Sequence, residues 1–268
     1  MRTYQKVVLC CWSVMSAALF AAAPARAPMI DVNVGDPNVS VKDSPISDIL
    51  VPNGFDDNDN VQIIAKGVYR DGCWRVYHTD FSVNHDTKEI KINTKSLHMD
   101  NQPCEQMIRP FIQVINIGVL DEGQYSVTGT STETDGPVVL STKLNIKKST
   151  TVEADDFRYA RLNSAYLDLN HITGKQSLNI HGEFDHLYEG CLVLKDTKIF
   201  EDPEGVLVVL PITETLHGSV CGTGYKYTFS YTKDLEVPFK GVRNTGTGVL
   251  HVRIASGNSI NTIITAEP

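Results

Sequence analysis

The sequence predicts an all-β protein built from two tandem β-sandwich domains. Short runs rich in Val, Ile, Thr and Tyr recur along the chain, and turn residues separate them about every 8–12 residues. A glycine, an aromatic residue, a Gly-Cys pair and a second cysteine follow one another in Gly67–Cys104 and again in Gly182–Cys221. A chain of 268 residues accommodates two domains of ordinary size, ~100–200 residues each.

The first 25 residues have the composition of a signal peptide. Arg2 and Lys6 precede an apolar run, and Ala23-Pro24-Ala25 provides a small-x-small cleavage site. A second such site ends at Ala27, and we prefer cleavage after Ala25 because the second would leave a proline at the new N-terminus. We therefore expect an exported protein, periplasmic or extracellular, with no membrane span after cleavage.

The charge of the chain excludes one class of partner. The full chain has a net charge of −8, and removal of residues 1–25 leaves 22 basic and 32 acidic residues, a net charge of −10. Nucleic acids and anionic lipids bind basic surfaces, and no basic cluster occurs in the sequence. We therefore expect neither as a partner.

Residues 26–50 are rich in Asp, Asn, Pro and Ser and are predicted to form an extended leader, with one strand around Ile46–Val51. An acidic turn follows, in which Asp56, Asp57 and Asp59 provide hard carboxylate ligands of the kind calcium prefers. Their spacing lacks the central glycine and distal glutamate of an EF-hand. Asx turns explain the same residues without a metal, and we favour that interpretation.

The first sandwich is predicted to span residues 51–148. Its strands alternate apolar and polar residues, most clearly after Glu89, and Asp135-Gly136 is typical of a hairpin turn. The expected strands begin at Val61, Cys73, Glu89, Ile112, Gly123 and Val138.

A polar stretch at 149–156 is the predicted linker, and residues 157–268 form the predicted second sandwich. An edge strand is expected within Phe157–Leu169. The remaining strands repeat the order of the first copy and begin at Ser177, Cys191, Gly205, Tyr227, Gly248 and Ile260.

Cysteine parity and compartment predict two disulfides in the mature chain. Three pairings of the four cysteines are possible, and the repeat selects Cys73–Cys104 and Cys191–Cys221, which keep each bridge inside one copy. A catalytic thiol would instead require an unpaired, activated cysteine.

This pattern resembles the architecture of immunoglobulin-like β-sandwich domains. It departs from true immunoglobulin domains because the cysteines are closer together and Trp74 directly follows the first of them. Each copy begins with a strand that ends in Gly-x-aromatic, and this beginning is also similar to uncharacterised exported bacterial domains, from which no activity can be inferred. The resemblance implies a fold of two tandem immunoglobulin-like sandwiches with one disulfide each, and no activity.

The residues of known catalytic motifs are missing from the sequence. It contains no Gly-x-Ser-x-Gly, His-Glu-x-x-His, phosphate-binding Gly-x-x-x-x-Gly-Lys or Cys-x-x-Cys. The acid pairs Asp155-Asp156 and Glu201-Asp202 are expected to be solvated. His98, Met99 and Met107 flank Cys104 and could form a soft copper site, although single scattered histidines favour surface positions.

Aromatic residues alternate along two expected strands and indicate either a core face or an exposed binding platform. We favour the core, because each sandwich strand needs one buried face. The residues are Trp74, Tyr77 and Phe81 in the first copy and Tyr225, Tyr227, Phe229 and Tyr231 in the second.

The leading functional hypothesis is a non-enzymatic exported binding or structural module, without a cofactor, for a protein or glycan ligand. It rests on the duplication, the predicted bridges and the missing catalytic motifs. The alternative is an exported copper- or calcium-binding protein, and the third possibility is a hydrolase, which would reveal itself by an acidic cleft containing a carboxyl group of raised pKa.

Overall fold

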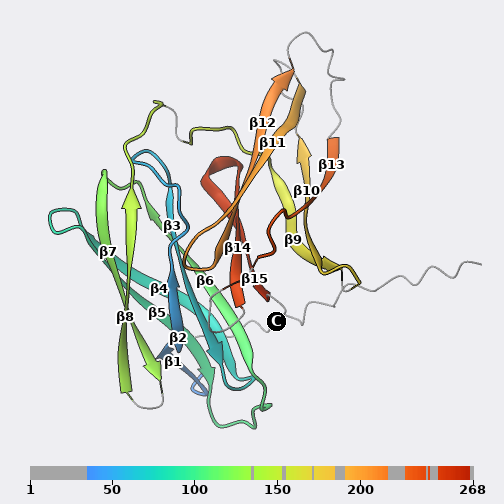
Figure 1. Cartoon of the computed structure of the whole chain (residues 1–268). Helices are drawn as coiled ribbons and strands as arrows, with labels where there is room; N and C mark the ends of the chain where they lie inside the picture. The colour runs from blue at the N-terminus through green and yellow to red at the C-terminus, as the bar shows by residue number, and fades with distance from the viewer. Residues whose placement is uncertain are drawn as a thin grey trace, which may run out of the picture. The chain divides into compact units, whose positions relative to one another are not determined.

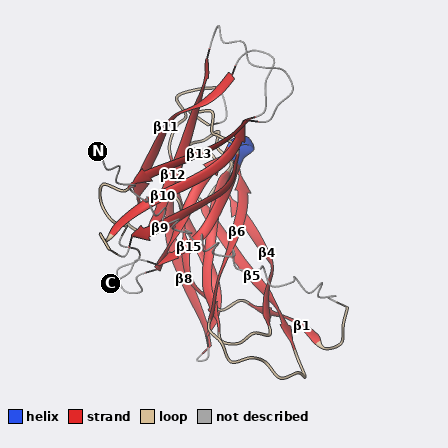
Figure 2. Cartoon of the chain, turned by 90° about the vertical axis from the view of Figure 1, so that its right-hand side faces the viewer, coloured by secondary structure: helices blue, strands red, loops and turns tan. Residues whose placement is uncertain are grey.

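The computed structural model describes residues 35–133, 136–152, 155–170, 172–184, 191–216, 227–239, 241 and 247–265. Strands dominate these residues, as Figures 1 and 2 show, and the one helical segment among them is the short 3₁₀ turn Ala255–Gly257. The all-β prediction is confirmed. The expected signal peptide, residues 1–25, lies outside the described residues.

The first sandwich consists of two sheets. One has the order β2-β3-β6, and the other has the order β1-β5-β7-β8 with β4 paired to β5. The strands are β1 (Val39–Asp43), β2 (Ile46–Leu50), β3 (Val61–Tyr69), β4 (Trp74–Asn84), β5 (Glu89–Met99), β6 (Arg109–Gly118), β7 (Gly123–Glu133) and β8 (Gly136–Ile146).

The second sandwich repeats this topology with the sheets β9-β10-β13 and β11-β12-β14-β15. Each copy contains one parallel pair, β5 with β7 and β12 with β14, among otherwise antiparallel pairs. The strands are β9 (Leu162–Asn170), β10 (Lys175–Phe184), β11 (Cys191–Glu201), β12 (Val206–Leu216), β13 (Tyr227–Asp234), β14 (Thr247–Ile254) and β15 (Asn258–Thr265). The strand correspondence expected from the sequence repeat is therefore present in the fold.

The Gly-x-aromatic motif makes the same contact in the first copy as in the second. Gly67 pairs with Phe111 of the neighbouring strand, and a Cβ at residue 67 would lie 2.6 Å from the Phe111 ring and 2.3 Å from the Pro45 carbonyl oxygen. Without a side chain at Gly67, the Phe111 ring lies over the glycine and stacks on Tyr69 at a centroid distance of 4.1 Å.

The second copy uses Gly182 in the same way. Gly182 pairs with Phe229, and an added Cβ would lie 2.7 Å from the Phe229 ring and 2.3 Å from the Arg161 carbonyl oxygen. The Phe229 ring stacks on Phe184 at 4.4 Å. The repeated motif is therefore a packing device of the fold.

Each sandwich has its own apolar core, and a third cluster joins them. This cluster contains Leu50 and Ile64 from the first copy and Tyr159, Val206 and Val208 from the second. β3 and β12 are buried on both faces, because one face covers their own core and the other covers this third cluster. The uninterrupted run of apolar residues in β12 is typical of a strand buried in this way.

The expected leader contributes two strands to the first sandwich. β2 agrees with the strand expected at Ile46–Val51, whereas β1 was not expected. β1 pairs with Lys95–Met99, so the hydrogen bonds that hold it come from a segment more than 50 residues away. The sheets of the first sandwich therefore begin before residue 51.

The disulfide Cys73–Cys104 is present, with a Cα–Cα distance of 5.4 Å. It joins the start of β4 to the segment that precedes β6. The expected partner of Cys191 is Cys221, and that bridge lies outside the described residues. Within the described part of the chain, no helix is long and apolar enough to cross a membrane.

Candidate functional site

A groove with a volume of about 650 Å³ lies at one end of the first sandwich, beside the disulfide. The groove forms at this end of the sandwich because β3 and β5 end there and β4 and β6 begin there. Its apolar wall contains Trp74, Val68 and Ile108, and the Ile108 side chain is 78% exposed. Arg70, Asp71 and His98 add polar groups.

A column of aromatic rings supports the groove. Trp74 stacks on Tyr69 at a centroid distance of 5.7 Å with an interplanar angle of 7°, and Tyr69 in turn stacks on Phe111. The ring of His98, which also lines the groove, lies 4.6 Å from Trp74, and the ammonium group of Lys42 lies 5.8 Å from the Trp74 ring centroid. These contacts hold the Trp74 ring in place.

Buried hydroxyl groups anchor the inner end of this column. The Tyr69 hydroxyl hydrogen-bonds to Ser96 Oγ at 2.7 Å, and Ser96 hydrogen-bonds to Ser44 Oγ at 2.6 Å. Burial raises the pKa of Tyr69 to about 12, so the phenol is neutral at physiological pH. Tyr69 therefore serves as a support and carries no charge.

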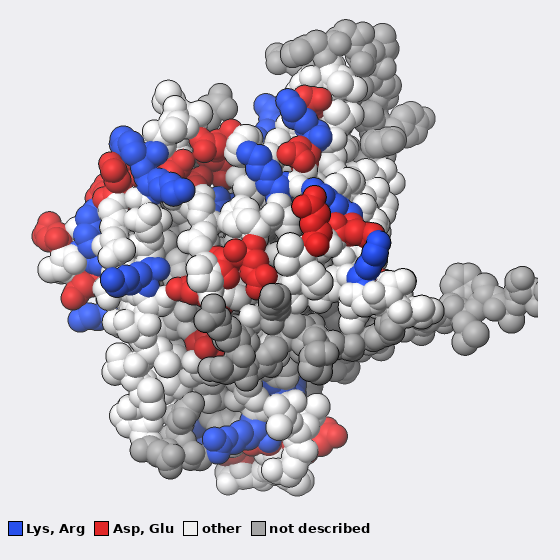
Figure 3. All heavy atoms as spheres, in the orientation of Figure 1, with Lys and Arg blue, Asp and Glu red and all other residues white. Residues whose placement is uncertain are grey.

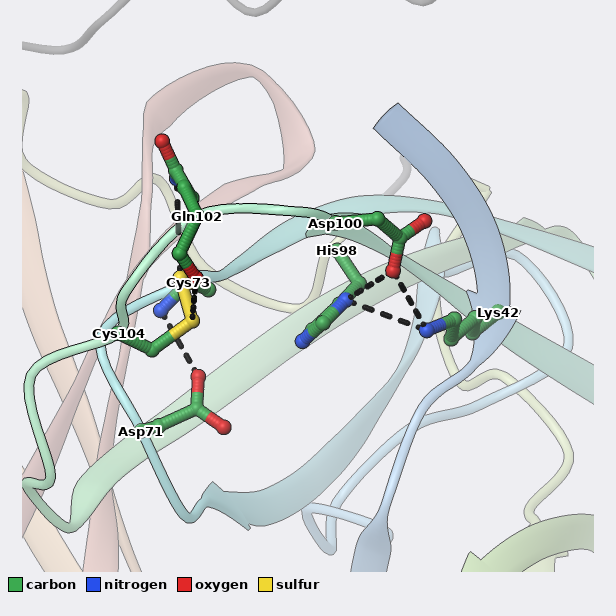
Figure 4. A network of polar contacts seen from close by, with 7 residues as sticks. All are labelled: Lys42, Asp71, Cys73, His98, Asp100, Gln102 and Cys104. Carbon is green, nitrogen blue, oxygen red and sulfur yellow. Dashed lines mark hydrogen bonds and ion pairs between the residues drawn. A yellow bond between two sulfur atoms is a disulfide. The ribbon is translucent and has the colours of Figure 1, made fainter. Parts of the chain in front are cut away.

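Polar contacts connect the groove to the disulfide, as Figure 4 shows. His98 Nδ1 lies 2.7 Å from Asp100 Oδ1, and the Lys42 ammonium group lies 3.0 Å from the same oxygen. Asp71 Oδ1 accepts a hydrogen bond from the backbone N–H of Cys73 at 2.9 Å. One carboxylate oxygen of Asp71, one ring nitrogen of His98 and Cys104 Sγ all lie within 4.8 Å of one another.

A second cavity, of about 430 Å³, lies where the linker meets both sandwiches, and Asp155 is part of its wall. Burial, followed by the charge and hydrogen bond of Asp59, raises the pKa of Asp155 to about 6. Asp59 is buried and lies 3.6 Å from Arg253 Nη1, and Arg253 donates hydrogen bonds to the carbonyl oxygens of Asn53 and Gly54. Arg253 of the second sandwich thereby binds the first.

The acidic turn is occupied by contacts within the protein. Asp56 Oδ1 accepts a hydrogen bond from the Asn58 N–H, the contact expected for an Asx turn, and Asp59 Oδ2 accepts one from the Asp56 N–H. Asp57 accepts a hydrogen bond from the Ser149 N–H and pairs with Lys148. Within the described residues, the group of side chains close enough together to hold a metal ion is Asp71, His98 and Cys104, beside the disulfide. The three aspartates of the acidic turn are not part of this group.

Of the four acids expected to be solvated, Asp156 and Glu201 are exposed as expected, whereas the other two are enclosed, which corrects the expectation for them. Asp155 lies in the second cavity, and Asp202 is only 4% exposed. Asp202 Oδ1 accepts hydrogen bonds from the N–H groups of Glu204 and Val206, and burial raises the pKa of Asp202 to about 6. Sequence reasoning misjudged Asp155 because Asp59 and Arg253, which interact with it, belong to distant segments.

Two of the three candidate copper ligands, His98 and Met99, point away from each other. His98 and Met99 are successive residues of β5, so their side chains leave opposite faces of the sheet. Met107 lies in the segment before β6 and is 40% exposed. The structure instead brings His98 together with Asp71 and Cys104, a combination that spacing along the chain did not indicate.

The aromatic residues divide between core and surface. Phe229 and Tyr231 pack against the second core, and Trp74 packs against the first, as predicted. Tyr77 and Phe81 are 40% and 43% exposed, which corrects the prediction for them. A bulge between Val76 and Thr79 shifts the register of this edge strand. Tyr225 and the Tyr227 side chain lie outside the described residues.

Lysine and arginine side chains are scattered among acidic ones on the face that Figure 3 presents. The described residues on this face show no continuous basic area of the kind that nucleic-acid binding requires.

Comparison with known proteins identifies one similarity. The family model of the ORF11 beta-sandwich domain matches residues 63–135, which comprise most of the first sandwich and less than half of the chain. Neither the curated proteins nor the solved structures yield a match. The similarity supports a β-sandwich and no more specific assignment.

Proposed function

We propose that this protein is an exported, non-enzymatic binding module whose ligand occupies the groove beside the Cys73–Cys104 disulfide. The observation that carries the proposal is the groove itself, an apolar wall with a few convergent polar groups on a rigid aromatic support. Such a combination is typical of binding sites, and pre-positioned side chains reduce the entropy lost on binding.

A protein segment suits the groove better than a glycan. Sugars stack on the open face of an aromatic ring, whereas the Tyr69 ring stacks on Trp74, and His98 and Lys42 also lie against the Trp74 ring. The exposed Ile108 and Val68 offer apolar contacts for a side chain of the partner. Arg70 and Asp71 can bind its backbone or charged groups.

Photo-crosslinking in the native source tests the proposal. A photoreactive amino acid at Ile108 should capture a defined protein partner, whereas the same amino acid at Val139, which is 69% exposed on β8, should not. The purified partner should then quench the fluorescence of Trp74, the only tryptophan left after signal cleavage. Identical captures at both positions would contradict the proposal, and binding in a glycan array alone would assign the groove to sugars.

The second cavity favours one other candidate function, a hydrolase that uses Asp155 and Asp59. A carboxyl group with a pKa of about 6 beside a second carboxylate is suited to general acid–base catalysis. Screening with ester, peptide and glycoside substrates tests this candidate. Turnover that Asp155→Asn abolishes would support it, and unchanged turnover would remove it.

A further inference from the structure

We propose that Asp71, Cys73, His98 and Cys104 form a transition-metal site, suited to Zn²⁺, which the disulfide closes and a dithiol reductant opens. The site goes beyond the binding function proposed above and does not rest on it, because it requires no ligand in the groove.

The positions of the donor atoms support this site. The Asp71 oxygen, the His98 nitrogen and Cys104 Sγ lie within 4.8 Å of one another, and Cys73 Sγ is bonded to Cys104 Sγ. Zn²⁺ binds sulfur at about 2.3 Å and nitrogen or oxygen at about 2.0–2.2 Å, so ligands of a tetrahedral ion lie about 3–4 Å apart. Small side-chain movements would therefore suffice once the S–S bond is broken.

Contacts behind the donors already orient them. His98 Nδ1 lies 2.7 Å from Asp100 Oδ1 and 3.2 Å from Lys42 Nζ, and Figure 4 shows the other ring nitrogen of His98 directed toward Asp71 and the disulfide. A carboxylate behind a histidine is the usual arrangement at metal sites, because it fixes the ring and raises the basicity of the ligating nitrogen. The hydrogen bond from the Cys73 N–H occupies Asp71 Oδ1 and fixes that carboxylate.

The two cysteines remain neighbours without their covalent bond. The Gly72 N–H donates to the Glu105 carbonyl oxygen at 2.8 Å, and the Met99 N–H donates to the Cys73 carbonyl oxygen at 3.1 Å. The first bond joins residues adjacent to the two cysteines, and the second holds Cys73 beside β5, the strand that carries His98. We therefore expect both thiols of the reduced protein to stay beside His98.

The chemistry balances with a dithiol as reductant. The dithiol becomes a disulfide, and its two electrons and two protons convert Cys73–Cys104 into two thiols. Zn²⁺ then displaces the thiol protons and binds the thiolates, His98 and Asp71. In the oxidised protein the sulfurs are bonded to each other, so only His98 and Asp71 remain as ligands and binding is weak.

The test measures metal binding to the processed protein with Cys191→Ser and Cys221→Ser, so that Cys73 and Cys104 provide all thiols. Competition with a chromophoric chelator should show one Zn²⁺ per reduced chain, bound at least 100-fold more tightly than by the oxidised chain. Co²⁺ should produce the charge-transfer absorption of thiolate ligation. His98→Gln, Asp71→Asn and Asp100→Asn should each weaken binding about 10–100-fold.

His78→Gln is the matched control, because His78 is an exposed histidine on β4. The proposal is overturned if reduction does not tighten binding, or if His98→Gln behaves like His78→Gln. Far-UV circular dichroism follows the fold throughout. If reduction unfolds the protein, added Zn²⁺ must restore the fold, and a chain that stays unfolded with the metal contradicts the site.

Discussion

The two sandwiches share a topology and differ where the groove lies. Both have the same strand order, the same parallel pair and a glycine covered by a stacked pair of rings. After the first cysteine, however, Trp74 pairs with His98 in the first copy, whereas Leu192 pairs with Thr215 in the second. β1 exists only in the first copy among the described residues, and it carries Lys42 to Trp74.

This difference separates what builds the fold from what builds the site. Residues needed for the sandwich recur in both copies because each copy must bury the same kind of core. The second copy lacks the aromatic pair and retains its sandwich, so Trp74 and His98 are not required for the fold. This contrast supports the proposal that the binding function belongs to the first copy.

The largest expected effect concerns Arg253, which binds the second sandwich to the first. Arg253→Met would leave the Asp59 carboxylate buried without its cation, and we expect the free energy of unfolding to fall by about 3–5 kcal/mol. Urea unfolding followed by Trp74 fluorescence and by circular dichroism measures it. The exposed Arg158→Met is the control. Equal stability of the two variants would show that the sandwiches do not depend on this contact.

The glycines test whether the repeated motif has the same role in both copies. Gly67→Ala and Gly182→Ala would place a methyl group against a backbone carbonyl and a phenyl ring, and each should destabilise by about 1–3 kcal/mol. Gly72→Ala is the control, because a Cβ there has only ordinary contacts at 3.5 Å. Chemical denaturation compares the three variants, and a large loss at only one motif would disprove the equivalence.

Replacing Trp74 and His98 by the residues at the equivalent positions of the second copy, Leu192 and Thr215, tests whether this pair makes the two copies differ in binding. Trp74→Leu with His98→Thr removes the stacking on Tyr69 and should lower the free energy of unfolding by only about 0.5–1.5 kcal/mol. Partner binding, measured calorimetrically, should be lost. The reciprocal Leu192→Trp with Thr215→His keeps the groove of the first copy and should still bind there, but it should not add a second binding site, because β1 and Lys42 have no counterpart among the described residues of the second copy. Retained binding by the first variant would place the ligand elsewhere.

The smallest expected effect is a pH dependence at the junction. The pKa of Asp155 is about 6 in the folded protein and 3.8 when unperturbed, so its contribution is complete below pH 3.8 and lost as the pH rises through 6. The side chain of Asp155→Asn is neutral at every pH. As the pH rises through this range, the free energy of unfolding of the variant should therefore come to exceed that of the wild type by about 1 kcal/mol, a value reduced for solvent screening.

Thermal unfolding between pH 4 and 7 measures this difference. The buried His251, whose pKa burial lowers to about 3, acts with the opposite sign, but its contribution cancels between variant and wild type. A difference that does not change with pH would mean that the pKa of Asp155 is not raised in the folded protein. Asp202→Asn tests the same pH range without an influence of Asp59, because the pKa of Asp202 is also about 6.

By itself, the sequence determined the all-β class, nearly every strand, the repeat and the Cys73–Cys104 bridge. The class and the strands depend on local chemistry, since alternation and turn residues act over short distances, and the bridge follows from cysteine parity together with the repeat. The tertiary structure decided the position of β1, the groove, the group of side chains that could hold a metal ion, and the junction. Trp74 and His98 are 24 positions apart, and Asp59 and Arg253 almost 200. Their proximity results from strand pairing and from packing between the sandwiches, which no local pattern encodes.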